Sequence, residues 1–165
     1  NVFMLGDSAG GQLCHQILTM LTNPKYAEKF SFAPPEDMTV RACALNCGCY
    51  FLPLSRLMSP KRCGVAFEAY FPEDYVPLLK QLKPEKYATK DFPPAIVMSA
   101  ANDFLKFMAK PMYRILRRKG VETQLHIYGK KSEKEIGHVF HLNCKLPLAA
   151  QCNDDQCAFF RKHMK

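Results

Sequence analysis

The amino-acid sequence predicts an α/β fold in which helices flank a mainly parallel sheet. Apolar segments of strand length alternate with amphipathic segments of helix length along most of the chain, which is the pattern of βαβ units. The segment Val40–Tyr50 is mostly apolar on both parities, as a parallel strand covered on both faces requires. With 165 residues and 48% hydrophobic side chains, the chain is long enough for one domain with a core.

The first expected strand ends at a serine that lies between glycines. The run Val2–Leu5 is apolar, and Gly6–Gly10 (G-D-S-A-G) follows it in the pattern G-x-S-x-G. This pattern is typical of a nucleophile elbow, a strained turn between strand and helix that lifts the serine hydroxyl above the edge of the sheet. We therefore expect a strand, a sharp turn and the start of a helix in this stretch.

The residue types of the elbow suit this chemistry. We expect a side chain at Gly6 or Gly10 to collide with neighbouring backbone, and glycine to tolerate the dihedral angles of the turn. Ser8, which follows Asp7, lies at the expected helix N-terminus, where free N–H groups and the helix dipole favour an oxyanion. The N–H of Ala9 is the expected first oxyanion donor. The same pentapeptide also fits a turn that binds a phosphate or nothing, so the rest of the chain has to decide.

A helix and a second strand follow the elbow. Residues 12–22 carry four apolar side chains at helical spacing, which we expect to face the sheet. These side chains are Leu13, Ile17, Met20 and Leu21. Asn23-Pro24 ends the helix, and residues 26–37 form a polar connection to the strand Val40–Tyr50. In this strand one face is expected to carry Cys43, Leu45, Cys47 and Cys49.

Between residues 51 and 92 the pattern loosens into short helical pieces, including 65–71 and 74–82, interrupted by prolines. Four aromatic side chains of this segment either line a pocket or pack the segment onto the core. They are Phe67, Tyr70, Phe71 and Tyr75.

Regular periodicity returns after Pro93-Pro94. Pro111 fits the first turn of a helix, where its missing N–H costs nothing, and Gly120 fits the end of the same helix. In chain order we expect a strand over 95–100, a helix over 111–119, a strand at the sheet margin over 121–128, a charged loop over 129–136 and a mostly helical segment over 146–163.

Three side chains with catalytic potential follow the ends of expected strands. Ser8, Asp103 and His138 come in the chain order serine, aspartate, histidine, which is the order of one group of serine hydrolases. Ligands of parallel sheets bind beyond the carboxyl ends of the strands, where these residues should meet. In such a triad Ser8 attacks an acyl carbon, His138 takes its proton and passes it to the leaving alcohol, and Asp103 orients the imidazole.

Each triad member has competitors in the sequence. His141 is the strongest alternative base, but only His138 follows a glycine, Gly137, that permits a sharp turn. The other histidines lie within elements or at the C-terminus. Asp91 precedes its strand and therefore lies at the wrong end of the sheet.

The motif G-D-S-A-G-G resembles the elbow of the hormone-sensitive-lipase-like esterases, a branch of the α/β-hydrolase superfamily. Asp103-Phe104-Leu105 is similar to the aspartate segment of this family, and Gly137-His138-Val139-Phe140 to its histidine motif. The resemblance implies that residues 1–165 form the C-terminal part of an α/β-hydrolase fold, with 51–92 as a cap-like insertion and the N-terminal half missing. The H-G-G-G-type oxyanion loop of the family does not occur in this chain.

The resemblance implies a serine esterase that cleaves small or medium acyl esters with neither a metal nor an organic cofactor. Two alternatives stay open: a non-catalytic binding domain with the same fold, and a peptidase of the same superfamily.

Composition and residue spacing argue against several other classes of function. The formal charge of +8 is scattered over helix ends and loops, without an RNA-binding motif, so we expect no nucleic-acid partner. No apolar run reaches the length of a membrane span, and no signal-peptide pattern starts the chain. The eight cysteines lack zinc spacing and fall largely in apolar segments, which favours reduced thiols and a cytoplasmic location.

Overall fold

The computed structural model describes residues 2–35, 37–52, 69–71, 75, 77–78 and 81–164. Its centre is a parallel sheet of four strands in the order β1-β2-β3-β4. The strands are β1 (Val2–Asp7), β2 (Val40–Asn46), β3 (Ala95–Ala100) and β4 (Thr123–Tyr128). This arrangement confirms the predicted α/β class with a parallel sheet.

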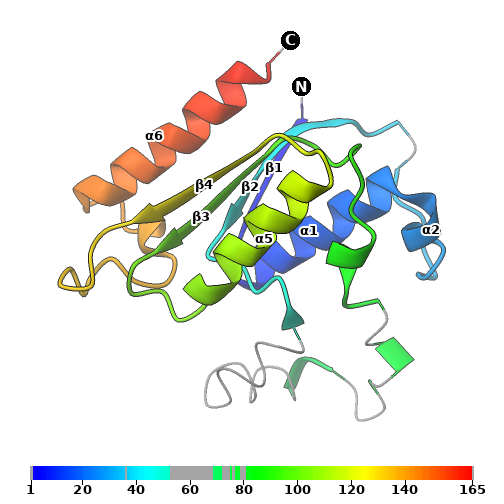
Figure 1. The fold of residues 1–165 in the computed structure, drawn as a ribbon, viewed down its shortest axis with the longest axis horizontal. Coiled ribbons are helices and arrows are strands. Elements are labelled where there is room, and N and C mark those ends of the chain that lie inside the picture. Colours follow the sequence, from blue (N-terminus) through cyan, green and yellow to red (C-terminus); the bar gives the residue numbers. More distant parts are fainter. Residues whose placement is uncertain are drawn as a thin grey trace.

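Helices cover both faces of this sheet (Figure 1). The helices α1 (Ala9–Thr22) and α5 (Lys106–Arg118) pack on one face, and α6 (Pro147–Lys162) packs on the other. Three short helices complete the described elements: α2 (Pro24–Ala27), η3 (Pro84–Lys86) and η4 (Phe140–Leu142). The core is accordingly divided into two layers, one under α1 and α5 and one under α6.

The strand register brings the ends of all four strands to one edge of the sheet. Asp7 pairs with Asn46, Asn46 pairs with Met98, and Ala100 pairs with Tyr128. Since every pair is parallel, the loops that leave these strands emerge on the same side. The sheet therefore places the residues that follow β1, β2 and β3 next to one another.

Two predicted boundaries are wrong, each for a local reason. The second strand ends at Asn46 and not at Tyr50, because Cys47 adopts a φ of 45°, which no strand residue has. The helix expected from Pro111 begins five residues earlier, at Lys106, so Pro111 lies inside it. The predicted helix stop is confirmed, since Gly120 has a φ of 85° and its N–H bonds the carbonyl of Arg117.

The buried face of α1 matches the predicted one only in part, since Met20 is buried as expected. Leu13 is 46% exposed, whereas Cys14, His15 and Leu18 are buried against the sheet. The prediction gave too much weight to side-chain hydrophobicity, since a histidine of this helix is buried and a leucine is exposed.

Part of the segment between β2 and β3 lies outside the described residues. This applies to most of the predicted helical pieces at 65–71 and 74–82, and to Phe67. Among the described aromatic residues, Tyr70 is 66% exposed and its ring contacts that of Phe71 at a centroid distance of 5.0 Å. The described ends of the segment, at Phe51 and Phe92, pack into the layer under α1 and α5.

Candidate active site

Ser8 lies in a strained turn between β1 and α1. Its φ of 55° and ψ of −116° are rare for a residue with a side chain. Two backbone hydrogen bonds hold this turn: the Ser8 N–H donates to the carbonyl of Asn46, and the Ser8 carbonyl accepts from the N–H of Cys49, both at 3.0 Å. The chain that leaves β2 thus fixes the peptide groups on either side of the serine.

The glycines of the elbow differ in how much space a Cβ would have at each position. A Cβ at Gly6 would lie 2.3 Å from the Gly10 carbonyl oxygen and 2.8 Å from the Cys14 sulfur, so the expected collision is confirmed there. At Gly10 the expectation is wrong, because a Cβ would meet no atom within 4 Å. The tighter neighbour is Gly11, whose Cβ would lie 3.1 Å from the Cα of Gly48. Within the elbow the positive φ belongs to Ser8 itself, at 55°.

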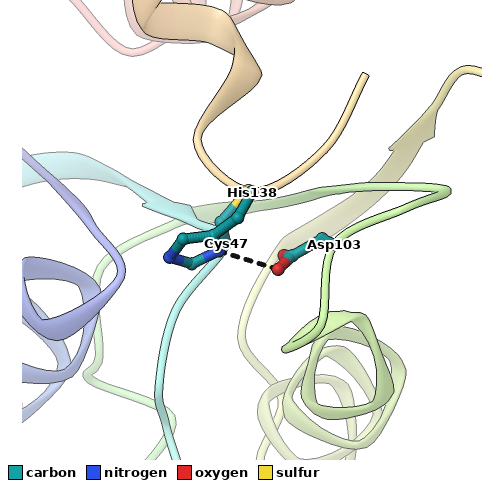
Figure 2. Close-up of side chains that lie close together, drawn as sticks. All are labelled: Cys47, Asp103 and His138. Atoms are coloured by element: carbon teal, nitrogen blue, oxygen red, sulfur yellow. Dashed lines mark hydrogen bonds and ion pairs between the residues drawn. The ribbon is translucent and has the colours of Figure 1, made fainter. Parts of the chain in front are cut away.

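His138 connects Ser8 to Asp103. The Nε2 atom of His138 lies 2.9 Å from Ser8 Oγ, and its Nδ1 lies 2.7 Å from Asp103 Oδ1. A proton on Nδ1 satisfies both contacts, because Nδ1–H then donates to the carboxylate and Nε2 accepts from the hydroxyl. Figure 2 shows the His138 and Asp103 side chains converging from two loops. The three residues named from the sequence form one hydrogen-bonded chain.

The carboxylate of Asp103 is buried and fully engaged. Its side chain has no exposed surface, and besides His138 it accepts from the N–H of Leu105 at 2.9 Å and from Ser99 Oγ at 2.7 Å. Burial acts to raise the pKa of Asp103. The hydrogen bonds from His138, Leu105 and Ser99, with the charge of His138, outweigh it and lower the pKa below the ordinary value. Asp103 therefore stays ionised and acts only as an acceptor.

The loop that carries His138 is fastened beside the loop that carries Asp103. Asn102 forms an isolated parallel bridge with Gly137, and its side-chain amide donates to the carbonyls of Lys130 and Glu133 at 3.1 and 2.7 Å. The ring of Phe104 packs on the imidazole of His138 with centroids 4.4 Å apart. The charged loop 129–136 is thus tied to the end of β3, which sets the position of His138.

His141 has a different partner from His138. Its Nε2 lies 2.6 Å from Asp7 Oδ1, and its side chain is only 5% exposed. Asp7 also accepts from Asn46 Nδ2 at 3.3 Å, and Asn46 donates to Gln156 of α6 at 2.9 Å. The alternative base of the sequence therefore belongs to a buried polar network behind the elbow, away from the Ser8 hydroxyl.

The N-terminus of α1 faces the serine. Ala9 is the first residue of this helix and is exposed, and the first N–H groups of a helix have no carbonyl partner within it. The helix dipole adds positive potential at the same end. An oxyanion formed next to Ser8 would find a donor at Ala9.

Two residues of the site were not predicted from the sequence. Ser99 lies four residues before Asp103 in an otherwise apolar, buried strand. Because a buried hydroxyl needs a hydrogen-bond partner, a serine in such a strand is a signal that could have been found in the sequence. Cys47 was assigned to an apolar strand, so its turn toward the site was not foreseen.

Cys47 and the acid–base pair also form the one group in the described part of the chain with ligand atoms close enough for a metal. Its Sγ, a carboxylate oxygen of Asp103 and a ring nitrogen of His138 lie within 4.8 Å of one another. Asp103 and His138 are already hydrogen-bonded to each other, and also to Ser99 and Ser8 respectively. A metal would have to displace the bond between His138 and Asp103, so the donor set fits a hydrogen-bonded cluster better than a metal site.

Comparison with known proteins identifies the family. A model of the α/β-hydrolase fold family matches residues 1–142. The chain belongs to the α/β-hydrolase fold family. The match confirms the superfamily and the hormone-sensitive-lipase-like branch that the elbow motif indicated. No curated protein matches the chain.

Solved α/β hydrolases share this fold at low sequence identity. Esterase B from Lactobacillus rhamnosis matches with a TM-score of 0.80 and 18% identity, over 98% of this chain and 52% of that protein. An acetyl ester-xyloside bifunctional hydrolase from Caldicellulosiruptor lactoaceticus matches with a TM-score of 0.66 and 17% identity, over 96% of this chain and 55% of that protein. A carboxylesterase from Lactobacillus plantarum WCFS1 matches with a TM-score of 0.59 and 18% identity, over 83% of this chain and 45% of that protein. The chain thus spans about half the length of these structures.

Two further observations concern the described residues as a whole. The seven cysteines among them are free thiols. None of their helices combines the length and the apolar character that crossing a bilayer requires.

Proposed function

We propose that the protein is a serine hydrolase that cleaves carboxylic esters of small or medium acyl groups through an acyl-enzyme on Ser8. The observation that carries this proposal is the continuous chain of hydrogen bonds from Ser8 through His138 to Asp103. The esterases among the structural neighbours support the same reaction class. The ionised Asp103 and the strained elbow support it from the site itself.

The reaction begins with the hydroxyl of Ser8. His138 Nε2 takes the hydroxyl proton while Oγ attacks the acyl carbon, and the carboxylate of Asp103 stabilises the imidazolium that forms. The N–H of Ala9 donates to the oxyanion. His138 then gives the proton to the leaving alcohol, and a water deprotonated by the same imidazole releases the acid. No step uses a metal or an organic cofactor.

We propose that residues 51–92 form a cap-like insertion that contributes to the wall of the acyl pocket. This segment connects two adjacent parallel strands, β2 and β3, and is much longer than the dozen or so residues that a crossover needs. Its described ends, at Phe51 and Phe92, pack into the core layer under α1 and α5, and Phe51 follows the carboxyl end of β2.

A labelling experiment tests the nucleophile in the full-length protein. A fluorophosphonate reacts readily only with a base-activated serine, so it should label the wild type and not a Ser8→Ala variant. Labelling that persists in Ser8→Ala would contradict the assignment.

The base is tested with a matched pair of histidine variants. His138→Ala should lower kcat for short p-nitrophenyl esters by roughly 10⁴-fold or more, as loss of a triad base does. His141→Gln keeps a side-chain N–H for Asp7 and should lose far less activity. Equal losses in the two variants, or a larger loss in His141→Gln, would remove His138 from its proposed role.

A further inference from the structure

Asp7 and His141 form a second link between the elbow and the base loop, residues 137–142, which carries His138. The first link is the bond between Ser8 Oγ and His138 Nε2 at 2.9 Å. The second joins Asp7 Oδ1 to His141 Nε2 at 2.6 Å, and Nε2 carries the proton because a carboxylate only accepts. Asp7 directly precedes Ser8, and His141 follows His138 by three residues. The two links therefore join the same two segments.

The second link belongs to a closed ring of hydrogen bonds. Besides its bond to Asp7, His141 accepts through its backbone carbonyl from Asn153 Nδ2 of α6 at 3.0 Å. Asn153 Oδ1 accepts from Gln156 Nε2 at 3.3 Å, and Gln156 Oε1 accepts from Asn46 Nδ2 at 2.9 Å. The same Nδ2 of Asn46 donates to Asp7 Oδ1 at 3.3 Å, which closes the ring. The ring ties the ends of β1 and β2 to the base loop and to α6.

Most of this ring is shielded from water. The side chains of Asn46, His141 and Gln156 are buried, whereas that of Asp7 is 27% exposed. A buried polar group that loses its partner has no water to replace it, so these hydrogen bonds are costly to break. The neighbouring core layer under α6 is built from apolar side chains, which fill space without such a requirement. The ring indicates that a fixed arrangement of the elbow and the base loop is needed here.

The ring also holds the strained conformation of Ser8. The backbone carbonyl of Asn46 accepts from the Ser8 N–H at 3.0 Å, and the side chain of Asn46 donates to Asp7. A φ of 55° at a residue with a side chain persists only where its surroundings fix it. Asn46 thus holds Ser8 through its backbone and the preceding residue through its side chain.

In the proposed reaction the first link cannot hold the base loop at every step. The Ser8 hydroxyl gives its proton to His138, and Oγ is then bonded to the acyl group until water releases the acid. We propose that Asp7 and His141 are positioning residues, which keep His138 within reach of Ser8 while the bond between these two breaks and re-forms. The proposal rests on the catalytic roles that we propose for Ser8 and His138.

Three variants of the full-length protein test this role. His141→Leu removes the second link and fills the site with an apolar side chain. His141→Gln keeps an N–H that can donate to Asp7. His15→Leu is the matched control, because His15 is also a buried histidine, but neither of its ring nitrogens has a hydrogen-bond partner in the described part of the chain. Unfolding in urea establishes that each variant is folded under the assay conditions.

We expect His141→Leu to lower kcat by roughly 10-fold, less than the ~10² that a 1 Å displacement of reacting groups costs, with KM little changed. His141→Gln should recover most of this loss, and His15→Leu should leave kcat at the wild-type value. If His141→Leu has the kcat of His15→Leu, or if glutamine is as poor as leucine, the positioning role is refuted and His141 only stabilises the fold.

A double-mutant cycle distinguishes one shared link from two independent effects. Asp7→Ala and His141→Leu should each lower kcat by roughly 10-fold, and the double variant should lose little more than either single variant, because all three remove the same bond. Losses that multiply to ~10² in the double variant would show that Asp7 and His141 act independently, which contradicts the proposal.

A further measurement does not depend on ester hydrolysis. The proton on Nδ1 of His138 lies in the bond to Asp103, and such a proton gives a separate NMR signal far downfield. We expect this signal to shift or broaden in His141→Leu, and to stay in place in His141→Gln and His15→Leu. An unchanged signal in His141→Leu overturns the proposal. If the wild-type protein hydrolyses no ester while the signal responds as expected, the proposed function fails and the positioning of His138 by His141 stands.

Discussion

The two outer glycines of the elbow provide a direct test of the local geometry, because alanine should have opposite effects at them. At Gly6 the added methyl would lie 2.3 Å from the Gly10 carbonyl oxygen, 2.5 Å from its carbon and 2.8 Å from the Cys14 sulfur. The first two are backbone atoms that no rotamer change can move. At Gly10 the same methyl would meet nothing within 4 Å.

The magnitude of the Gly6→Ala effect follows from these distances. A normal contact requires the start of α1 to move away from β1 by roughly 1 Å, and an extra methylene in a packed region costs about 1–3 kcal/mol or more. Ser8 lies between the two glycines, so the same movement displaces its hydroxyl from His138. A displacement of this size near the reacting atoms costs about 10²-fold in rate. Gly6→Ala should therefore lose both stability and kcat/KM.

Gly10→Ala should be more stable than the wild type. Gly10 is the second residue of α1, and alanine is favoured over glycine in a helix by roughly 0.5–1 kcal/mol. Urea denaturation of the two variants of the full-length protein measures both signs in one experiment, and hydrolysis of a short ester measures the loss in Gly6→Ala. The steric reasoning is refuted if Gly6→Ala unfolds at the wild-type urea concentration, or if Gly10→Ala is as unstable as Gly6→Ala.

Two further predictions concern pH and metals. His15 is fully buried with no hydrogen-bond partner for either ring nitrogen in the described structure, and burial lowers its pKa to about 3. The folded pKa lies below the unfolded value of 6.5, so the unfolded state binds the extra proton and stability is lost as the pH falls from 6.5 toward 3. At pH 5 the wild type should have lost about 2 kcal/mol of stability in this way, at 1.36 kcal/mol per pKa unit, and His15→Phe should not show this loss. Equal pH slopes of the free energy of unfolding in the variant and the wild type would show that His15 does not titrate in this way. Prolonged dialysis against a chelator should leave ester hydrolysis unchanged, because Asp103 and His138 are hydrogen-bonded to each other and to Ser99 and Ser8. A loss of activity that added Zn²⁺ restores would assign a metal to the group of Cys47, Asp103 and His138.

Much of this fold was predictable because its strands are short, apolar and well separated. The strand Ala95–Ala100 has the predicted bounds, and the parallel order that joins it to its neighbours follows from the alternation of strands and helices. The triad residues were predictable for the same reason. Once the sheet is parallel, residues that follow strand ends must meet at one edge, and Ser8, Asp103 and His138 all do so.

The errors arise where tertiary contacts decide between local alternatives. No local pattern distinguishes Leu13 from His15 as the inward residue of α1, because His15 is buried against residues distant in the sequence, with ring contacts to Tyr50 and Phe92. Nothing in the apolar run around Cys47 shows that the strand must end there. That ending is imposed by Ser8, whose peptide groups bind Asn46 and Cys49 and so pull this part of the chain out of the sheet.

The three residues with a positive φ explain how the groups of the site come to lie beyond the carboxyl edge of the sheet. A strand that continued straight would direct its next side chains alternately into the two core layers. A single positive φ reverses this direction within one residue, so that the side chain or the following backbone N–H projects over the edge. Ser8 does this after β1 and Cys47 after β2, and Val139 does it in the loop that Asn102 ties to the end of β3.

The cost of this arrangement, of the order of 1–3 kcal/mol at each residue, is offset by neighbouring bonds that relaxation would break. Relaxing Ser8 would break its two bonds to Asn46 and Cys49, and relaxing Cys47 would break the bond from its N–H to the carbonyl of Met98. The strain at Ser8 and Cys47 is thus shared, because the two residues that bind the peptide groups of Ser8, Asn46 and Cys49, lie on either side of Cys47 in the chain. A perturbation at either of these two residues should therefore be felt at the other.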